Sequence, residues 1–174
     1  VIPDTLGGYP VSYIGDSAFY GCDNLTSVTI PNNIKSIGSS AFNKCSNLVN
    51  VVLPNNLKQI SDHAFTGCKN LKSIDIPNSV TYIDDFAFYD CRNFNKVKIL
   101  SSVEAIGRFA FSGTTYIKEL YIDDINSYLT RSYYNDFIPF SATNIYVNDV
   151  LLENLVIDDK ITQIPDYAFE YCHS

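Results

Sequence analysis

Apolar and polar positions alternate in a pattern that returns every 23 residues along most of the chain. Residues 25–47 read LTSVTIPNNIKSIGSSAFNKCSN, and the same arrangement returns at 48–70, 71–93 and 94–116. An Ala-Phe pair recurs in phase with the period at 18/19, 41/42, 64/65, 87/88 and 110/111, and a cysteine follows three residues after the first four of these pairs. Because these copies neither gain nor lose a residue, each is expected to stack on the previous one as a turn of a solenoid.

Each copy predicts one short strand that is buried on one face. Leu25, Val28 and Ile30 alternate with polar residues, and Pro31 follows directly. Proline has no backbone N–H to donate to a neighbouring strand, so it ends the strand at the same place in each copy. The strands of successive copies are expected to lie parallel to one another, about 4.7 to 4.9 Å apart.

The second half of each copy predicts a tight helical turn. Ile34 and Ile37 continue the apolar pattern, and a column of short polar residues then precedes the Ala-Phe pair. Such residues are good helix N-caps, since the side-chain oxygen accepts a hydrogen bond from an unpaired backbone N–H. All but one member of the column fits this role: Asp16, Ser39, Asp62, Asp85, Arg108 and Asp166.

A 23-residue period that begins with Leu-x-x-Ile-x-Ile predicts an α/β repeat solenoid of the leucine-rich repeat class. Its expected form is a right-handed superhelix with a short parallel β-strand per repeat and short helical turns on the other side. The chain is expected to be one such domain over residues 1–174. Its regular repeats are 25–116 and 152–174, and an irregular repeat with an insertion occupies 117–151.

Two stretches depart from the period. The first repeat holds five extra residues, and Gly7-Gly8 marks them as a turn. Residues 117–151 are twelve residues longer than one repeat and lack the Ala-Phe-x-x-Cys sequence. Within them, Asp124 is placed to cap a short helix, and Asn148-Asp149 is typical of a two-residue β-hairpin turn.

The copies closely resemble the BspA-like class of leucine-rich repeats, whose pattern is C-x-x-L-x-x-I-x-I-P-x-x-V-x-x-I-G-x-x-A-F-x-x-C. Residues 22–45 read CDNLTSVTIPNNIKSIGSSAFNKC, and the match covers residues 1–120 and 152–174. The resemblance implies a secreted or surface-anchored protein, found mainly in host-associated bacteria, with adhesion to host or microbial proteins as a function of some members. It supplies no catalytic motif. Both ends of the chain fall within repeats, so a piece of a longer protein is expected.

Charge argues against nucleic acid as a partner. The formal net charge is −7. Residues 1–120 hold ten acidic and ten basic side chains, whereas residues 121–174 hold nine acidic residues against Arg131 and Lys160. Phosphate binding needs a basic face that neutralises several charges. No apolar run is long enough to span a membrane either.

The cysteines and carboxylates of the repeat have structural interpretations. Stacked cysteines with parallel Cβ vectors lie too far apart at Cβ for disulfides, and a straight ladder offers no tetrahedral zinc site. We therefore expect buried free thiols. The aspartate column lacks the glycine-rich pattern of calcium-binding β-solenoids and reads as helix caps, so no metal or cofactor is expected. His63 and His173 are not placed beside a nucleophile, and the chain is predicted not to be an enzyme.

Two groups of side chains form the candidate binding surface. Lysines gather on and beside the strands of repeats four to six, either as a basic patch or as ordinary solvated side chains. Aromatic residues of the insertion have no core position that requires them, so they either anchor a partner or cover the widened rung. The predicted surface residues are Lys72, Lys96, Lys98, Lys118, Tyr121, Tyr128, Tyr133, Tyr134 and Phe137.

The sequence thus predicts a non-enzymatic binding module, presented on a bacterial cell surface or secreted. Its concave strand face and aromatic insertion would bind an extracellular protein or glycan, and the chain is expected to be a monomer. The competing hypothesis is a stiff structural spacer within a larger surface protein.

Overall fold

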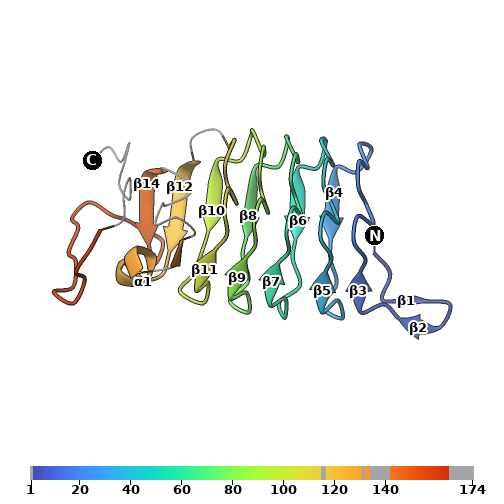
Figure 1. Cartoon of the computed structure of the whole chain (residues 1–174), viewed down its shortest axis with the longest axis horizontal. Helices are drawn as coiled ribbons and strands as arrows, with labels where there is room; N and C mark the ends of the chain where they lie inside the picture. Colours follow the sequence, from blue (N-terminus) through green and yellow to red (C-terminus); the bar gives the residue numbers. More distant parts are fainter. Residues whose placement is uncertain (1, 115–116, 131, 134–141, 165–174) are drawn as a thin grey trace.

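The computed structural model describes residues 2–114, 117–130, 132–133 and 142–164. Successive repeats stack side by side as rungs along the long axis of the molecule (Figure 1). The N-terminal rung and the insertion-bearing rung lie at opposite ends of this stack (Figure 1). The predicted repeat solenoid is confirmed.

One longer strand per repeat builds the main sheet surface, as the apolar alternation predicted. The strands are β4 (Ser27–Thr29), β6 (Asn50–Val52), β8 (Ser73–Asp75), β10 (Lys96–Lys98), β12 (Ile117–Ile122) and β14 (Ala142–Val147). Parallel pairing joins β4 to β6, and β8 to β10, β12 and β14 in that order, so that Val28 lies opposite Val51 and Val97 opposite Leu120. The three-residue strands bury the central residue and turn the flanking ones outward, and the two six-residue strands bury more than one residue each.

A second, two-residue strand in each rung was not predicted. The strands are β3 (Tyr13–Ile14), β5 (Ser36–Ile37), β7 (Gln59–Ile60), β9 (Tyr82–Ile83), β11 (Ala105–Ile106) and β13 (Ser132–Tyr133). Parallel pairing joins β3 to β5, and β7 to β9, β11 and β13 in that order. The second residue is buried in β3, β5, β7, β9 and β11. Ile37, Ile60 and Ile83 were expected to be apolar core positions, but two residues are too few to reveal an alternation.

The prediction of short helical turns on the side opposite the long strands is wrong. Over 38–45, for example, the chain forms turns and no helix. The residue before each Ala-Phe alanine has a φ of 55° to 57°, and one left-handed residue interrupts a right-handed helix. Among the described residues, the helix is confined to the insertion. The left-handed residues are Ser17, Ser40, His63, Phe86 and Phe109.

Backbone N–H groups of these turns donate alternately to the next rung and within their own turn, where for example the Tyr20 N–H donates to the Ser17 carbonyl at 3.0 Å. The Ser17 N–H donates to the Ser39 carbonyl at 2.9 Å, and the Phe19 N–H donates to the Ala41 carbonyl at 2.8 Å. This ladder satisfies donors that a helix would have satisfied internally. The turns therefore depend on their neighbours, as expected of a repeat array.

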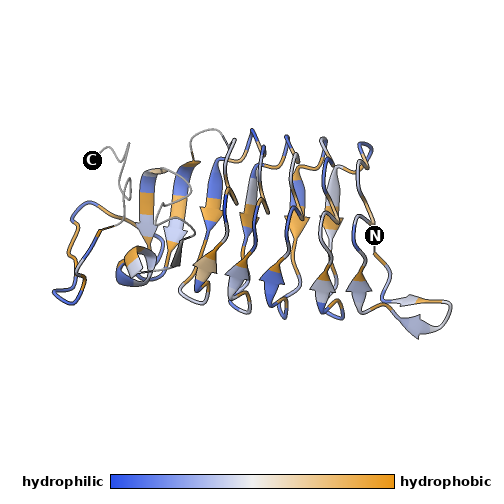
Figure 2. Ribbon diagram, in the orientation of Figure 1, coloured by the Kyte–Doolittle hydropathy of each residue, from blue (hydrophilic) through white to orange (hydrophobic). Residues whose placement is uncertain are grey.

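Phenylalanine rings form a continuous stack through the core. Phe42 and Phe65 have centroids 5.4 Å apart, Phe65 and Phe88 5.5 Å, and both pairs are within 3° of parallel. Phe19 and Phe111 extend the stack at its two ends. Apolar positions recur at the same height in successive rungs, which Figure 2 shows as repeated orange segments.

The irregular stretches form local structures of their own. Residues 4–13 contain a hairpin of β1 (Thr5–Leu6) and β2 (Tyr9–Pro10), with the predicted turn at Gly7-Gly8. In the insertion, Asp124 accepts hydrogen bonds from the N–H groups of Asn126 and Ser127 and caps α1 (Ile125–Thr130) as predicted. The bonds from Ser127 hold the pKa of Asp124 below its ordinary value.

The predicted second hairpin is also confirmed. β14 pairs antiparallel with β15 (Val150–Leu151), and Asn148 and Asp149 have φ values of 51° and 64°. The chain after β15 forms no strand over 152–164, where Leu155 is 42% and Val156 80% exposed. The repeat pattern of 152–174 is therefore not accompanied by a strand in its described part. Residues 165–174, with the predicted Asp166 cap, lie outside the described residues.

Within the described ranges, no helix is long and apolar enough to cross a membrane.

Close contact between rungs makes one glycine column sensitive to substitution. A Cβ at Gly107 would lie 2.6 Å from the backbone N of Asp85 on the preceding rung. We expect Gly107→Ala to lower the free energy of unfolding by about 1 to 3 kcal/mol in urea denaturation, since the two rungs must move apart. Gly15→Ala is the control, because its nearest contact is a Tyr13 ring atom at 3.8 Å. Equal losses in both variants would contradict this explanation.

Candidate binding surface

The outward side chains of the long strands form two columns along the solenoid, which we call the strand face. Over β4, β6 and β8 these side chains are mostly small or polar, and from β10 onward they are charged and aromatic. The register places them in order. One column is Ser27, Asn50, Ser73, Lys96, Glu119 and Asn144, and the other is Thr29, Val52, Asp75, Lys98, Tyr121 and Tyr146.

Lys96, Glu119 and Tyr121 form a connected cluster on this face. The Lys96 Nζ lies 4.2 Å from the centre of the Tyr121 ring and 3.6 Å from Glu119 Oε2. The Tyr121 hydroxyl donates to the same carboxylate oxygen at 3.1 Å. Partial burial and this hydrogen bond raise the pKa of Tyr121. The cluster holds a cation, an anion and an aromatic ring in fixed relative positions.

Tyr146 extends the cluster onto β14. Its ring stacks on that of Tyr121 with centroids 4.5 Å apart and planes within 6°. Both side chains are partly exposed. Beside them, Lys98 Nζ lies 3.8 Å from Asp149 Oδ1 in the β14–β15 turn. We call Lys96, Lys98, Glu119, Tyr121 and Tyr146 the strand-face cluster.

Three predicted surface residues belong to this cluster, and two more lie beside it. Lys96, Lys98 and Tyr121 are brought together as expected. Lys72 and Lys118 are exposed but come one position before the outward column, next to Ser73 and Glu119. Tyr146 was missed, because the insertion hides its register with Tyr121.

Among the predicted aromatic residues of the insertion, the structure describes the side-chain burial of Tyr128 alone. Tyr128 is 1% exposed and packs from α1 into the core, so it cannot contact a partner from this position. Its place on the apolar side of α1, next to Leu129 and three residues after Ile125, was the available signal. Tyr133 lies in β13, whose backbone pairs with β11. Tyr134 and Phe137 lie outside the described residues.

The described cysteines of the ladder are free thiols, as predicted. Cys45, Cys68 and Cys91 are buried free thiols, and Cys22 at the N-terminal rung is partly exposed. Burial raises the pKa of Cys45 to about 11 and that of Cys91 to about 12, and raises that of Cys68 further still. The buried thiols are thus neutral at physiological pH and are poor nucleophiles.

The thiols donate hydrogen bonds to the preceding rung. The Sγ atoms of Cys45 and Cys68 lie 3.0 and 3.2 Å from the carbonyl oxygens of Phe19 and Phe42. Cys91 repeats the contact with Phe65 at 3.2 Å. A thiol in this position acts as a small apolar side chain that also pairs a buried carbonyl.

The aspartate column links rungs and does not cap helices. Asp16 Oδ1 accepts a hydrogen bond from the Ser39 N–H at 2.8 Å, and Asp85 Oδ1 accepts one from the Arg108 N–H at 2.7 Å. These two carboxylates therefore bind the turn of the next rung, whereas Asp62 contacts His63 Nδ1 on its own turn at 2.7 Å. Among the residues that the structure describes, no group of three or more His, Cys, Asp or Glu side chains is arranged to hold a metal ion.

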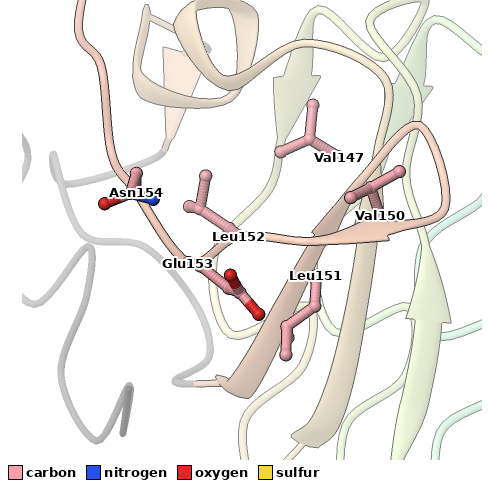
Figure 3. A pocket seen from close by; sticks show the side chains of 6 residues that line it. All are labelled: Val147, Val150, Leu151, Leu152, Glu153 and Asn154. Atoms are coloured by element: carbon pink, nitrogen blue, oxygen red, sulfur yellow. The ribbon is translucent and has the colours of Figure 1, made fainter.

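Two surface hollows lie at the ends of the described solenoid. One, of about 400 Å³, lies at the N-terminal rung and is lined by apolar side chains that include Leu6, Val11 and Phe19. The other, of about 310 Å³, lies beside the β14–β15 hairpin, where Figure 3 shows its six lining side chains. Glu153 is its one ionisable side chain, so the hollow holds no pair of groups for acid–base chemistry.

Comparison with protein families and solved structures agrees with this architecture. Residues 12–138 and 142–174 match the description "BspA type Leucine rich repeat region", with six copies. No curated protein matches the chain.

Solved structures of bacterial proteins are similar to the chain. A leucine-rich cell surface protein from Faecalibacterium prausnitzii A2-165 is 34% identical with a TM-score of 0.69, over 71% of this chain and 33% of that one. The leucine-rich repeat protein of T. pallidum is 28% identical with a TM-score of 0.63, over 84% and 71%. One from Bacteroides ovatus is 27% identical with a TM-score of 0.54, over 86% and 45%. The chain thus spans about a third of the F. prausnitzii protein.

Proposed function

Because the chain belongs to the BspA-type leucine-rich repeat family, we propose that it is a non-enzymatic binding module of a bacterial surface or secreted protein. Its partner is an extracellular protein or glycan of the host or of another microbe. The cell-surface location is supported by the F. prausnitzii relative, which is described as a leucine-rich cell surface protein.

The strand-face cluster is the observation that carries this proposal. The solenoid itself needs only small polar side chains at these outward positions, as Ser27 and Thr29 show on β4. From β10 to β14 the same columns hold a lysine, a carboxylate and two stacked tyrosines in mutual contact. Tyrosine and charged groups fixed by one another lose little side-chain entropy on binding, and aromatic residues are enriched among binding hot spots.

A double variant tests the cluster without disturbing the fold. Lys96→Ser with Tyr121→Thr restores the residues that Ser27 and Thr29 hold in the same two columns. Surface plasmon resonance against fibronectin, laminin, collagen and yeast mannan is expected to show saturable binding to at least one of them. The double variant should then bind about tenfold more weakly or worse, as expected when two hot-spot side chains are removed.

The chain offers a matched control for this experiment. Lys44 Nζ lies 5.3 Å from the centre of the Tyr20 ring, away from the strand face. Lys44→Ser with Tyr20→Ser removes an equivalent cation–aromatic pair and should leave binding unchanged. Equal losses in both double variants would sink the assignment to the strand face.

The structural spacer is the alternative. It is favoured by the uninterrupted phenylalanine stack, which makes each rung depend on its neighbours. Failure to bind any of the probes, together with a folded chain, would support the spacer.

A further inference from the structure

A row of aromatic rings lies on the turns that precede the Ala-Phe pairs, away from the strand face. His63, Phe86 and Phe109 occupy the same position in three successive rungs. Their ring centroids are 4.7 and 5.3 Å apart, and the planes are within 19° and 29° of parallel. Tyr89 adds its ring at 5.6 Å in an edge contact with Phe86. We call these four residues the turn ridge.

Side chains of the ridge are exposed, and they occupy a position at which the repeat does not need an aromatic residue. Phe109 is 53% and Tyr89 40% exposed. The two earlier rungs hold Ser17 and Ser40 in the ridge column, with the same backbone conformation. The fold therefore accommodates a small polar side chain there.

The backbone of the ridge is strained. His63, Phe86 and Phe109 have φ values of 55° to 56°, in the left-handed region that large side chains rarely adopt. Ser17 and Ser40 share this conformation, so the strained backbone belongs to the repeat and does not require a ring. The aromatic side chains are therefore additions that the fold does not need, which indicates a use outside it.

Ring spacing limits what the ridge fits. Both faces of Phe86 are covered, by His63 on one side and Phe109 on the other. A sugar ring that needs an open aromatic face is not accommodated there. The ring centroids are spaced 4.7 and 5.3 Å apart, close to the pitch of an α-helix of about 5.4 Å, so apolar side chains one turn apart on a helix can lie over successive ring edges.

The surroundings of the ridge are acidic. Carboxylates outnumber guanidinium groups on the turns that carry the ridge. Two of the carboxylates are paired with a guanidinium group, Asp85 with Arg108 and Asp90 with Arg92, each at 2.7 Å. Asp62 lies 2.7 Å from His63 Nδ1 and is 44% exposed. Asp84 adds a fourth carboxylate, which accepts the Asp85 N–H. A partner with basic residues beside an apolar stripe complements this charge.

We propose that the turn ridge docks an amphipathic α-helix of a partner protein, with an apolar stripe bordered by lysine or arginine. The apolar stripe lies along the ring edges, and the carboxylates of Asp62 and Asp84 attract its basic border. This surface is separate from the strand-face cluster, so one solenoid presents two binding surfaces on different sides of its rungs.

Calorimetric titration with two synthetic helical peptides tests the proposal. Both are 18-residue amphipathic sequences of leucine with either lysine or glutamate. The wild-type chain should bind the Leu/Lys peptide saturably at low salt and the Leu/Glu peptide at least tenfold more weakly. Phe86→Ser with Phe109→Ser should weaken Leu/Lys binding about tenfold or more, since two anchor rings are lost.

Controls distinguish peptide binding at the turn ridge from nonspecific binding elsewhere on the chain. The double variant should remain folded with a cooperative melting transition, because Ser17 and Ser40 show that serine fits this backbone. Phe109→Ser alone gives a second, less invasive variant. Tyr9→Ser removes a ring that is 79% exposed on the N-terminal hairpin and should leave binding unchanged. The proposal is overturned if the ridge variants bind the Leu/Lys peptide as the wild type does. It is also overturned if Tyr9→Ser weakens binding equally, or if the two peptides bind alike.

Discussion

Phe65→Ala is expected to lower the free energy of unfolding by about 3 to 5 kcal/mol, as large-to-small changes of buried aromatic residues do. Phe65 is fully buried and stacks on Phe42 and Phe88 at 5.4 and 5.5 Å. The substitution removes both ring contacts and leaves a cavity between two rungs. Rungs held by their neighbours cannot close that cavity without breaking the strand register. Urea denaturation followed by circular dichroism measures the loss.

Phe19→Ala is the matched control for this prediction. Phe19 belongs to the same column, but it is only partly buried and stacks on Phe42 alone in the described core. Its replacement should cost clearly less than that of Phe65. If both variants lose the same free energy, the stack does not contribute through contacts on both faces of the ring.

The regular part of the fold was predictable because the same pattern of apolar and polar positions recurs in each repeat. Val28 and Val97 lie at equivalent places, and the structure buries both. Five copies in phase leave one register for the parallel strands. The hairpin at Asn148-Asp149 was equally accessible, since the turn requires positive φ at two residues and these two tolerate it.

The turns were mispredicted because the same residues are compatible with a capped helical turn and with a turn that contains a left-handed residue. A column of Asp and Ser before an apolar pair is typical of helix N-caps, and the local sequence gives no sign that the next residue is left-handed. Ser17 and Phe109 share this conformation although their side chains differ completely. The conformation is imposed by hydrogen bonds to the next rung, such as that from the Ser17 N–H to the Ser39 carbonyl.

The candidate site was predictable only in part, for a related reason. Lys96, Lys98 and Tyr121 follow from the strand register, because outward positions repeat with it. Tyr128 looked free of core constraints, since the insertion has no repeat to define its inside. Only three-dimensional packing shows that α1 buries it. The turn ridge was hidden, because its residue types vary along the column while its geometry does not.

The free energy of unfolding is expected to fall steeply between about pH 9 and pH 11 because of the cysteine ladder. An unfolded cysteine has a pKa of about 8.5. Burial raises the pKa of Cys45 to about 11 and that of Cys91 to about 12 in the folded chain. In this window the unfolded state loses thiol protons that the folded state keeps. It therefore binds fewer protons, and stability declines as pH rises.

Cys68→Ala isolates this effect from the titration of lysines and tyrosines. The Cys68 thiol donates to the Phe42 carbonyl and is wholly buried, with a pKa raised far above its ordinary value. Each buried thiol contributes at most about 1.4 kcal/mol per pH unit to the decline. Urea denaturation at several pH values, in a reducing buffer, should give Cys68→Ala a shallower decline than the wild type by up to this amount.

The variant also loses some stability at pH 7 through its cavity, so the prediction is tested by the slopes of stability against pH and not by the absolute values. Identical slopes would mean that the thiol ionises in the folded state as readily as in the unfolded one, and that the rungs open around Cys68 at alkaline pH.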